Sequence, residues 1–260
     1  MRRSRSLQVW GRALAELALP VSCPGCGAPE VSLCPDCARS LVARARIVSP
    51  SAWSPALPVW AGPHYQGTVS RAIVAWKDRG RLDLTPFLAG CLAGTLAFAL
   101  AAGSGGPRSE WRDGAGAPVL LVPAPSTAAA TRHRGEDVVA LLARAAADLL
   151  RARGDPVLPP LLVLPALRLR AGVADQAGLR AGQRRRNVSG RVRPALGCRS
   201  LLAGRQALLV DDVVTTGSTA SAAVRALEGA GAIVLGACAI CATPRGNLRG
   251  VAVSGAIQVV

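Results

Sequence analysis

Apolar residues fall into short runs and helical patterns that alternate along the chain from about residue 60 onward. Four runs are almost wholly apolar, as in strands buried inside a parallel sheet, and they lie at 119–122, 161–164, 207–210 and 233–240. Helices are predicted between them, over 136–151 and 218–228. This alternation predicts an α/β fold in which helices flank both faces of a parallel sheet.

Two further apolar segments precede these elements. A helical run begins at Val69 and is expected to continue beyond Leu82. The next segment, from Leu84 to Gly106, has no charged residue and is long enough to cross a bilayer. Pro86, five glycines and many alanines weaken its tendency to insert. We therefore expect a buried helix and no membrane span.

Irregular stretches suggest how the chain is divided. A Pro-, Ser- and Trp-rich connector is expected around Ser49–Pro58, a Gly-rich loop over Gly103–Pro118, and an Arg-rich polar stretch over Arg168–Arg193. We predict two domains, one formed by residues 1–45 and the other by residues 46–260. The first would hold an amphipathic helix and a cysteine module, and the second the α/β fold.

The N-terminal segment is basic and mildly apolar but lacks the pattern of a signal peptide. Arg12 and Glu16 interrupt its apolar stretch. A helix would instead gather apolar side chains on one face, namely Leu7, Trp10, Leu14 and Leu17. Without an export signal we expect a cytoplasmic protein, in a compartment that does not favour disulfides.

The chain is strongly basic, with a formal net charge of +16. Arginine supplies nearly all of the positive charge, and Lys77 is the single lysine. The codons of a GC-rich genome explain most of this preference for arginine. The excess charge still attracts polyanions, either nucleic acid or phosphorylated metabolites, without indicating which.

Two C-x2-C pairs lie close together before residue 40. Cys23 and Cys26 form the first pair, Cys34 and Cys37 the second, with seven residues between the pairs. Each pair offers two thiolates from one tight turn, and two pairs complete a tetrahedral four-thiolate zinc site. Because four protein ligands leave no position for a substrate, we expect structural Zn²⁺. Replacing Cys26 with Ser is expected to unfold the N-terminal region and leave the larger domain intact.

The remaining cysteines show no such pattern. They are Cys91, Cys198, Cys238 and Cys241. The last two also have C-x2-C spacing, but they lie at the end of a predicted strand instead of a tight turn. We expect both to be core residues.

The strand predicted at 207–210 leads into a dense set of polar residues. The carboxylates Asp211 and Asp212 come first, and after Val213 and Val214 a small loop opens a helix, Thr215-Thr216-Gly217-Ser218-Thr219. Such a loop can present backbone N–H groups to a phosphate, and the helix N-terminus adds a favourable field. Carboxylates at the end of a strand can accept hydrogen bonds from ribose hydroxyls. A helix cap without ligand is the alternative, but a cap alone would not need this whole sequence.

These residues resemble the signature of type I phosphoribosyltransferases, which bind phosphoribosyl pyrophosphate. The resemblance implies that Asp211 and Asp212 are catalytic and hold the ribose hydroxyls. The loop Thr215, Thr216, Gly217, Ser218 and Thr219 would then hold the 5′-phosphate, and Val213 and Val214 before it are included among the residues that bind phosphoribosyl pyrophosphate. In that family Mg²⁺ bridges pyrophosphate and ribose oxygens, and a nucleophile displaces pyrophosphate at the anomeric carbon. The metal and arginine side chains stabilise the leaving group.

Three further segments, with the cysteine pairs, extend the resemblance to the competence-associated ComF family. Val122-Pro-Ala-Pro125, followed by Arg132-His-Arg134-Gly135, resembles its pyrophosphate-side strand and loop, which implies that Arg134 contacts the ligand. The others are Asp175-Gln176-Ala-Gly-Leu179 with Arg184-Arg-Arg186-Asn187-Val188, and Trp76-Lys77-Asp-Arg-Gly80. The chain departs from the family after Gly135, where Glu136, Asp137 and Val138 replace an aromatic-Asn-Gln run.

Two functions remain open from the sequence. The first is phosphoribosyl pyrophosphate binding, with transfer of the phosphoribosyl group to an unidentified acceptor. The second is a non-catalytic role in DNA uptake, in which the fold binds single-stranded DNA or a competence helicase. The arginines that could clamp pyrophosphate or a nucleic acid backbone, or form only a solvated basic surface, are Arg132, Arg134, Arg184, Arg185 and Arg186. His133 is a candidate acid or base or a loop residue, and no partner is identified for His64.

Two substitutions follow from the phosphate-loop prediction. Asp211→Asn should weaken ligand binding, and Gly217→Val should abolish it by placing a side chain where the backbone approaches phosphate. Because both positions are predicted to lie at a loop, neither change is expected to lower the melting temperature of the ligand-free protein much.

Overall fold

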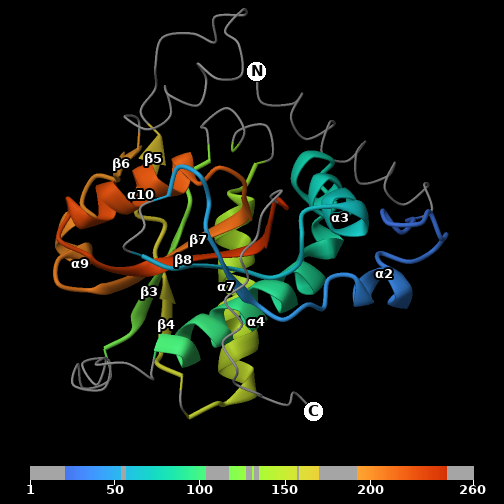
Figure 1. Ribbon diagram of the computed structural model, residues 1–260, viewed down its shortest axis with the longest axis horizontal. Coiled ribbons are helices and arrows are strands. Elements are labelled where there is room, and N and C mark those ends of the chain that lie inside the picture. Colours follow the sequence, from blue (N-terminus) through green and yellow to red (C-terminus); the bar gives the residue numbers. More distant parts are fainter. Residues whose placement is uncertain are drawn as a thin grey trace, which may run out of the picture.

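The computed structural model describes residues 21–53, 57–103, 117–126, 131, 135–156, 158–169 and 192–244 (Figure 1). Its strands are β1 (Arg46–Val48), β2 (Val59–Ala61), β3 (Val119–Pro123), β4 (Leu161–Val163), β5 (Leu167–Leu169), β6 (Val192–Pro194), β7 (Gln206–Val214) and β8 (Ile233–Ala242). Its helices are α2 (Pro35–Arg39), α3 (Gly67–Asp78), the short η1 (Leu82–Leu84), α4 (Thr85–Gly103), α7 (Val138–Arg153), α9 (Arg199–Leu202) and α10 (Ser218–Glu228).

Six of these strands form one sheet in the order β1-β2-β8-β7-β3-β4. The five strands from β2 to β4 are parallel, and only β1 runs antiparallel to its neighbour β2. The predicted α/β fold with a mostly parallel sheet is therefore confirmed. The central strand β7 pairs with β3 on one side and β8 on the other, so the end of β7 lies in the middle of the sheet's carboxyl edge.

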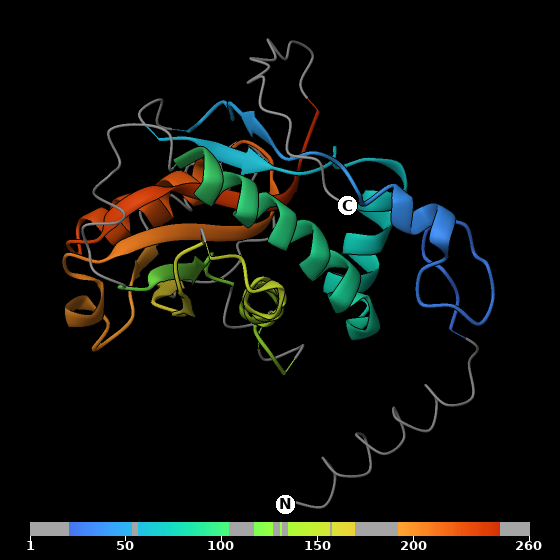
Figure 2. The same cartoon turned by 90° about the horizontal axis from the view of Figure 1, so that it is seen from below.

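Helices cover the sheet on both faces, and the side chains of β7 alternate between them. Leu208 and Val210 join an apolar cluster with residues of α3, α4 and α7. Ala207 and Leu209 join a second cluster with residues of α10. Figures 1 and 2 show α4 and α7 on one side of the sheet and α10 on the other.

The expected helical run from Val69 past Leu82 is wrong in its length. Helix α3 ends at Asp78, and Gly80 follows with a φ of 70°. This left-handed conformation commonly ends helices because glycine has no Cβ to resist it. A second helix, α4, starts at Thr85 after the short η1.

Helix α4 lies within the uncharged segment from Leu84 to Gly106, for which the sequence predicts a buried helix. The run Leu82–Ala102 is the one described helix that is long and apolar enough to cross a bilayer, and 56% of its most apolar window is buried inside the protein. Leu88, Leu92 and Leu96 are fully buried in the cluster shared with α3 and α7. The helix thus has the contacts expected of a core helix.

Three irregular regions differ from their predictions. Strand β7 extends to Val214, so Asp211 and Asp212 lie within the strand and do not follow it. The region predicted as a connector is flanked by β1 and β2, two sheet strands that the sequence did not indicate. The Arg-rich stretch begins and ends in an antiparallel pair, β5 and β6. The N-terminal amphipathic helix and most of the Gly-rich loop lie outside the described residues.

Candidate functional site

The carboxyl end of β7 brings one acidic residue together with the predicted phosphate loop. Asp211 and residues 213 to 220 line a single surface pocket, which Asp212 does not line. Asp212 is buried, with 3% of its surface exposed, and its carboxylate contacts Lys77 of α3. The two neighbouring carboxylates therefore have different surroundings, which their adjacency in the sequence did not suggest.

The loop from Thr215 to Gly217 leads into α10, and the first residues of that helix, up to Ala220, line the same pocket. In the described part of the chain, no backbone carbonyl accepts a hydrogen bond from the N–H groups of residues 215 to 219. The Thr216 and Ser218 hydroxyls lie 3.0 Å apart, and no side chain caps the helix. Such N–H groups at a helix N-terminus are donors for an anion.

Gly217 is required by the protein itself, in addition to any ligand. Its φ is 77°, and a Cβ built on it would lie 2.9 Å from Pro50 Cβ and 3.5 Å from Trp53 Cβ. The prediction that a side chain here would leave the ligand-free protein stable is thus contradicted. The sequence placed Gly217 in an open loop, but in the fold it is buried beneath the segment after β1.

That segment, residues 49–53, supports the phosphate loop from outside. The Ala52 N–H donates to Thr216 O at 2.8 Å, and the Ser221 hydroxyl donates to Ala52 O at 2.6 Å. Pro50 packs on Gly217, as its contact with the added Cβ shows. The predicted connector is therefore part of the site's scaffold.

The electrostatic surroundings of Asp211 favour its protonated form. Burial raises the pKa of Asp211 well above its usual range, the Asp212 charge adds to this, and the Lys77 charge opposes it. The Asp211 Oδ1 atom accepts a hydrogen bond from the Asp212 backbone N–H at 2.9 Å. A carboxyl that retains its proton can both donate and accept hydrogen bonds.

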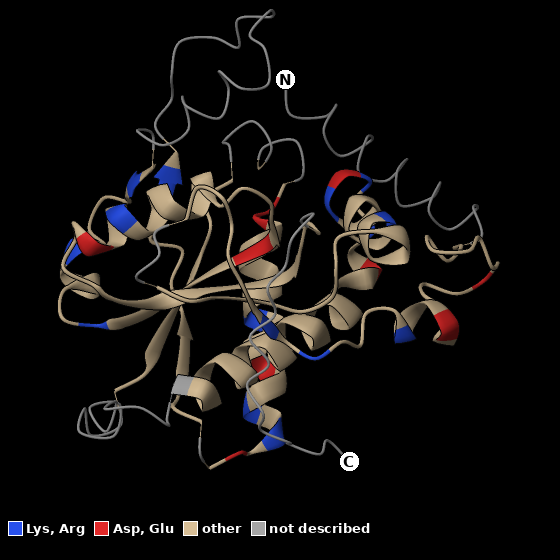
Figure 3. Cartoon of the chain, viewed as in Figure 1, with Lys and Arg blue, Asp and Glu red and all other residues tan. Residues whose placement is uncertain are grey.

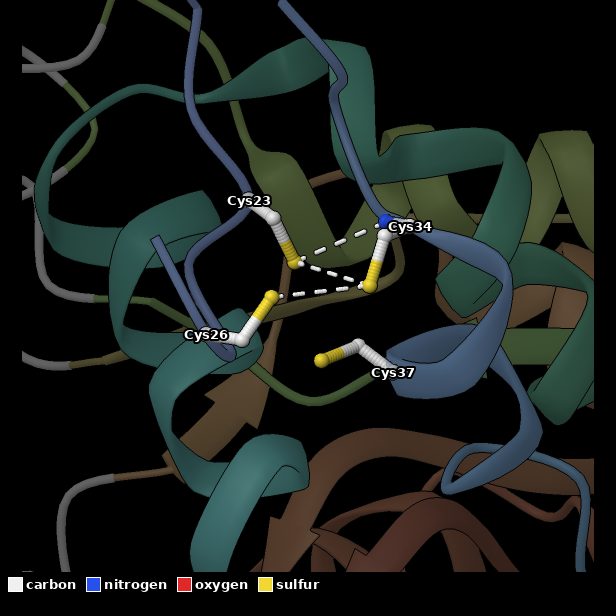
Figure 4. A group of neighbouring side chains, drawn as sticks. All are labelled: Cys23, Cys26, Cys34 and Cys37. Carbon is white, nitrogen blue, oxygen red and sulfur yellow. Dashed lines mark hydrogen bonds between the residues drawn. The ribbon is translucent and has the colours of Figure 1, made fainter. Parts of the chain in front are cut away.

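The four predicted zinc ligands come together in the cysteine module beside α3. The sulfur atoms of Cys23, Cys26, Cys34 and Cys37 all lie within 4.8 Å of one another, and they point toward a common centre in Figure 4. Cys34 Sγ is 3.8 Å from Cys23 Sγ and 3.6 Å from Cys26 Sγ. A tetrahedral zinc with Zn–S bonds of about 2.3 Å needs sulfurs about 3.8 Å apart, so the cluster could hold zinc.

Backbone groups favour the thiolate form at one of these ligands. Burial acts against the Cys23 thiolate, but backbone hydrogen bonds from Cys34, Cys26 and Gly25 lower its pKa to about 6. Burial and the neighbouring sulfurs raise the pKa of Cys37 to about 12. Crowded thiols of this kind lose their protons together when a metal binds.

The cysteine module packs into the α/β domain and shares its core. Cys23, Leu33 and Cys37 belong to the same apolar cluster as Trp76 and Leu88. Figures 1 and 2 place the module beside α3 in both views. The interpretation of Cys238 and Cys241 as core residues is confirmed, because both are fully buried in β8.

Several residues singled out in the sequence lie outside the described part of the chain. They are Arg132, His133, Arg134, Asp175, Gln176, Arg184, Arg185, Arg186 and Asn187. Asp137, which departs from the ComF pattern, is described as the N-cap of α7 and accepts a hydrogen bond from Ala140 N. Its role there is to begin the helix.

His64 has a partner that the sequence did not indicate. Its Nδ1 atom is 3.0 Å from a terminal nitrogen of Arg46, and burial together with the Arg46 charge lowers the pKa of His64. Arg46 also donates to Gly62 O and lines a small pocket with Thr215. These residues lie on separate segments around β1 and β2, so their sequence spacing gave no signal.

Comparison with known protein families finds a match over the part of the chain that contains this pocket. Residues 178–253 match the family model of the phosphoribosyl transferase domain. The matched range contains β6, β7, α10 and β8, and with them the pocket at the end of β7. No curated protein matches the chain. The match and the mostly parallel α/β fold together support assignment to a type I phosphoribosyltransferase-like family.

Proposed function

We propose that this chain binds phosphoribosyl pyrophosphate and is a phosphoribosyltransferase of the ComF type that acts in the cytoplasm. The supporting observation is that Asp211 and residues 213 to 220 line one pocket within the matched domain. The 5′-phosphate would bind the N–H groups of Thr215 to Thr219, and Asp211 would bind a ribose hydroxyl.

In this proposal the chain binds and orients the donor sugar. Backbone N–H groups fix the phosphate, which holds the anomeric carbon at a set distance from Asp211. Mg²⁺ bound together with the ligand would supply positive charge that neutralises the leaving pyrophosphate. Arg134 is proposed to assist on the pyrophosphate side, and Asp212 to support Asp211. The four-cysteine cluster is proposed to hold structural Zn²⁺.

Titration calorimetry with phosphoribosyl pyrophosphate and Mg²⁺ tests this function. Wild type should bind, and Asp211→Asn should weaken binding about tenfold, because an NH₂ donor replaces one carboxyl oxygen and a hydrogen bond accepted from a ribose hydroxyl is lost. Arg144→Ala is a suitable control because Arg144 is exposed on α7. If wild type produces no heat of binding at millimolar ligand, the chain is not a phosphoribosyl pyrophosphate-binding protein.

A separate observation favours a second function, in which the protein binds single-stranded DNA during natural competence and acts with a helicase partner. Arg168 of β5 lies directly opposite Arg193 of β6, and both are exposed. Among the described residues, neither forms an ion pair. Like charges placed opposite each other destabilise a strand pair, and a phosphate backbone would relieve the repulsion. Figure 3 shows basic segments on this strand pair, and both a basic and an acidic segment on α10.

The salt dependence of binding to an oligothymidine separates the two functions. Arg168→Ala and Arg193→Ala should each reduce the log–log salt slope by about 0.7 for each phosphate that the variant no longer binds. Arg151→Ala removes an exposed arginine of α7 and should leave the slope unchanged. If the oligonucleotide does not bind at low salt, the DNA proposal is wrong and the metabolite proposal is unaffected.

A further inference from the structure

The ion pair between Lys77 and Asp212 joins two elements that are far apart in the sequence. Lys77 Nζ lies 2.5 Å from Asp212 Oδ2, across 135 residues, and links α3 to the end of β7. The Asp212 side chain is 4% exposed and that of Lys77 is 33% exposed. Lys77 is also the only lysine in the chain.

This pair differs from the other ion pairs of the described residues. The other three join side chains two or three positions apart, and in each case both partners are more exposed than Asp212: Arg39 with Asp36, Arg81 with Asp83, and Arg151 with Asp148. Exposed local pairs contribute little to structure. A buried carboxylate, in contrast, requires a partner, and Asp212 receives a cation from another element of the fold.

The position of Lys77 is itself fixed by contacts at both ends of α3. Four residues after Lys77, the Arg81 guanidinium donates to Ser22 O at 2.9 Å and to Ser32 O at 3.3 Å in the cysteine module. At the other end, a Cβ added to Gly25 would lie 2.7 Å from Thr68 Cγ2 of α3. The cysteine module thus holds α3 in place while Lys77 reaches β7.

The pair also distinguishes the two adjacent carboxyl groups of β7. Asp212 is bound to Lys77 and does not line the pocket, whereas Asp211 lines it beside the phosphate loop. Tyr65 and Cys241 are titratable groups near Asp212, and burial raises the pKa of both. Lys77 is therefore the cation that meets the carboxylate pair from α3.

We propose that Lys77 is a positioning residue of the phosphoribosyl site. By holding Asp212 it fixes the end of β7, so that Asp211 is the carboxyl presented to the sugar beside the phosphate loop. This inference rests on the proposed function. It adds a residue outside the matched range 178–253 to the site. Lys77 acts through Asp212 and is not assigned a contact with the reacting atoms.

Two probes distinguish positioning from general support of the fold. Inorganic phosphate reports on the loop from Thr215 to Thr219 alone, and ribose 5-phosphate reports on the loop and the sugar-binding carboxyl together. Affinities of wild type, Lys77→Met and Arg151→Met are measured for both probes by calorimetry and phosphorus NMR. Arg151→Met is a matched control because Arg151 forms a 2.5 Å ion pair that is fully on the surface.

Lys77→Met should reduce the affinity for ribose 5-phosphate about tenfold and leave that for phosphate nearly unchanged, and Arg151→Met should change neither. Lys77→Met also leaves Asp212 buried without its cation, so its melting temperature should fall. The double variant Lys77→Met with Asp212→Asn removes both charges. It should regain the melting temperature but not the affinity for ribose 5-phosphate.

Other outcomes overturn the inference. If Lys77→Met weakens both probes equally, or if the double variant binds ribose 5-phosphate like wild type, Lys77 only supports the fold. If Lys77→Met is too unstable to study, the double variant alone decides between these results. Wild type that binds phosphate and ribose 5-phosphate equally well, or neither of them, refutes the proposed function and this inference with it. If wild type prefers ribose 5-phosphate to phosphate, and Lys77→Met and the double variant keep that preference unchanged, the inference alone is refuted.

Discussion

Replacing Gly217 with Ala should destabilise the ligand-free protein, even though the change adds one methyl group. The φ of 77° costs an L-residue about 1–2 kcal/mol. The new Cβ would also lie 2.9 Å from Pro50 Cβ, well inside the contact distance of about 3.5–4.0 Å between carbon atoms. Relieving such an overlap costs about 1–3 kcal/mol.

The sum of these costs, about 2–5 kcal/mol, should lower the melting temperature by roughly 5–15 °C for a chain of this size. Thermal unfolding followed by circular dichroism measures the effect. Gly94→Ala is the control, because nothing lies within 4 Å of a Cβ built on Gly94 in α4. That change should stabilise the helix by about 0.5–1 kcal/mol. If Gly217→Ala melts with or above wild type, the close packing of Pro50 on the phosphate loop is incorrect.

The remaining predictions concern the carboxylate, the metal and the support of the loop. The fold raises the pKa of Asp211, so the stability that its protonated carboxyl contributes is present below the unfolded pKa and is lost as pH rises through the folded pKa. Asp211→Asn should therefore be more stable than wild type at pH 8 and lose that advantage at pH 4. Urea unfolding at both pH values measures the difference. Cys26→Ser, or a chelator, should remove one zinc per chain by metal analysis. From the sequence the larger domain was expected to stay intact in this variant, but the module shares its core with Trp76, so the whole chain should lose stability in a single transition. A separate transition for the α/β domain would contradict this revised prediction. Ser221→Ala removes the 2.6 Å hydrogen bond to Ala52 O, so it should lower the free energy of unfolding by about 1 kcal/mol and weaken phosphate binding. Unchanged phosphate affinity would argue against support of the loop by residues 49–53.

Elements with a strong local pattern were predicted well. Helix α10 spans Ser218–Glu228, as expected, because Gly217 and the small hydroxylated residues mark its start. The buried strands β3, β7 and β8 were recognised from their apolar composition, since strands covered on both faces are apolar throughout. The four-cysteine cluster was found because its ligands are local in the sequence.

Features that depend on distant contacts were not predictable from the same patterns. Strands β1 and β2 have only three residues each, and the proline-rich segment between them indicated a connector. The length of β7 was underestimated because Asp211 and Asp212 interrupt its apolar run, and the sheet pairing with β8 overrides that local signal. The pairing of Lys77 with Asp212 joins residues 135 positions apart, so no sequence periodicity could reveal it.

The most direct test of the proposed function is a crystal structure of the protein with ribose 5-phosphate. We expect the phosphate to accept hydrogen bonds from the backbone N–H groups of Thr215 to Thr219, and a ribose hydroxyl to lie within hydrogen-bond distance of the Asp211 carboxyl. The phosphorus should then occupy the pocket lined by residues 213 to 220. Density for the ligand at any other place, with this pocket empty at saturating concentration, would contradict the assignment of the phosphoribosyl site.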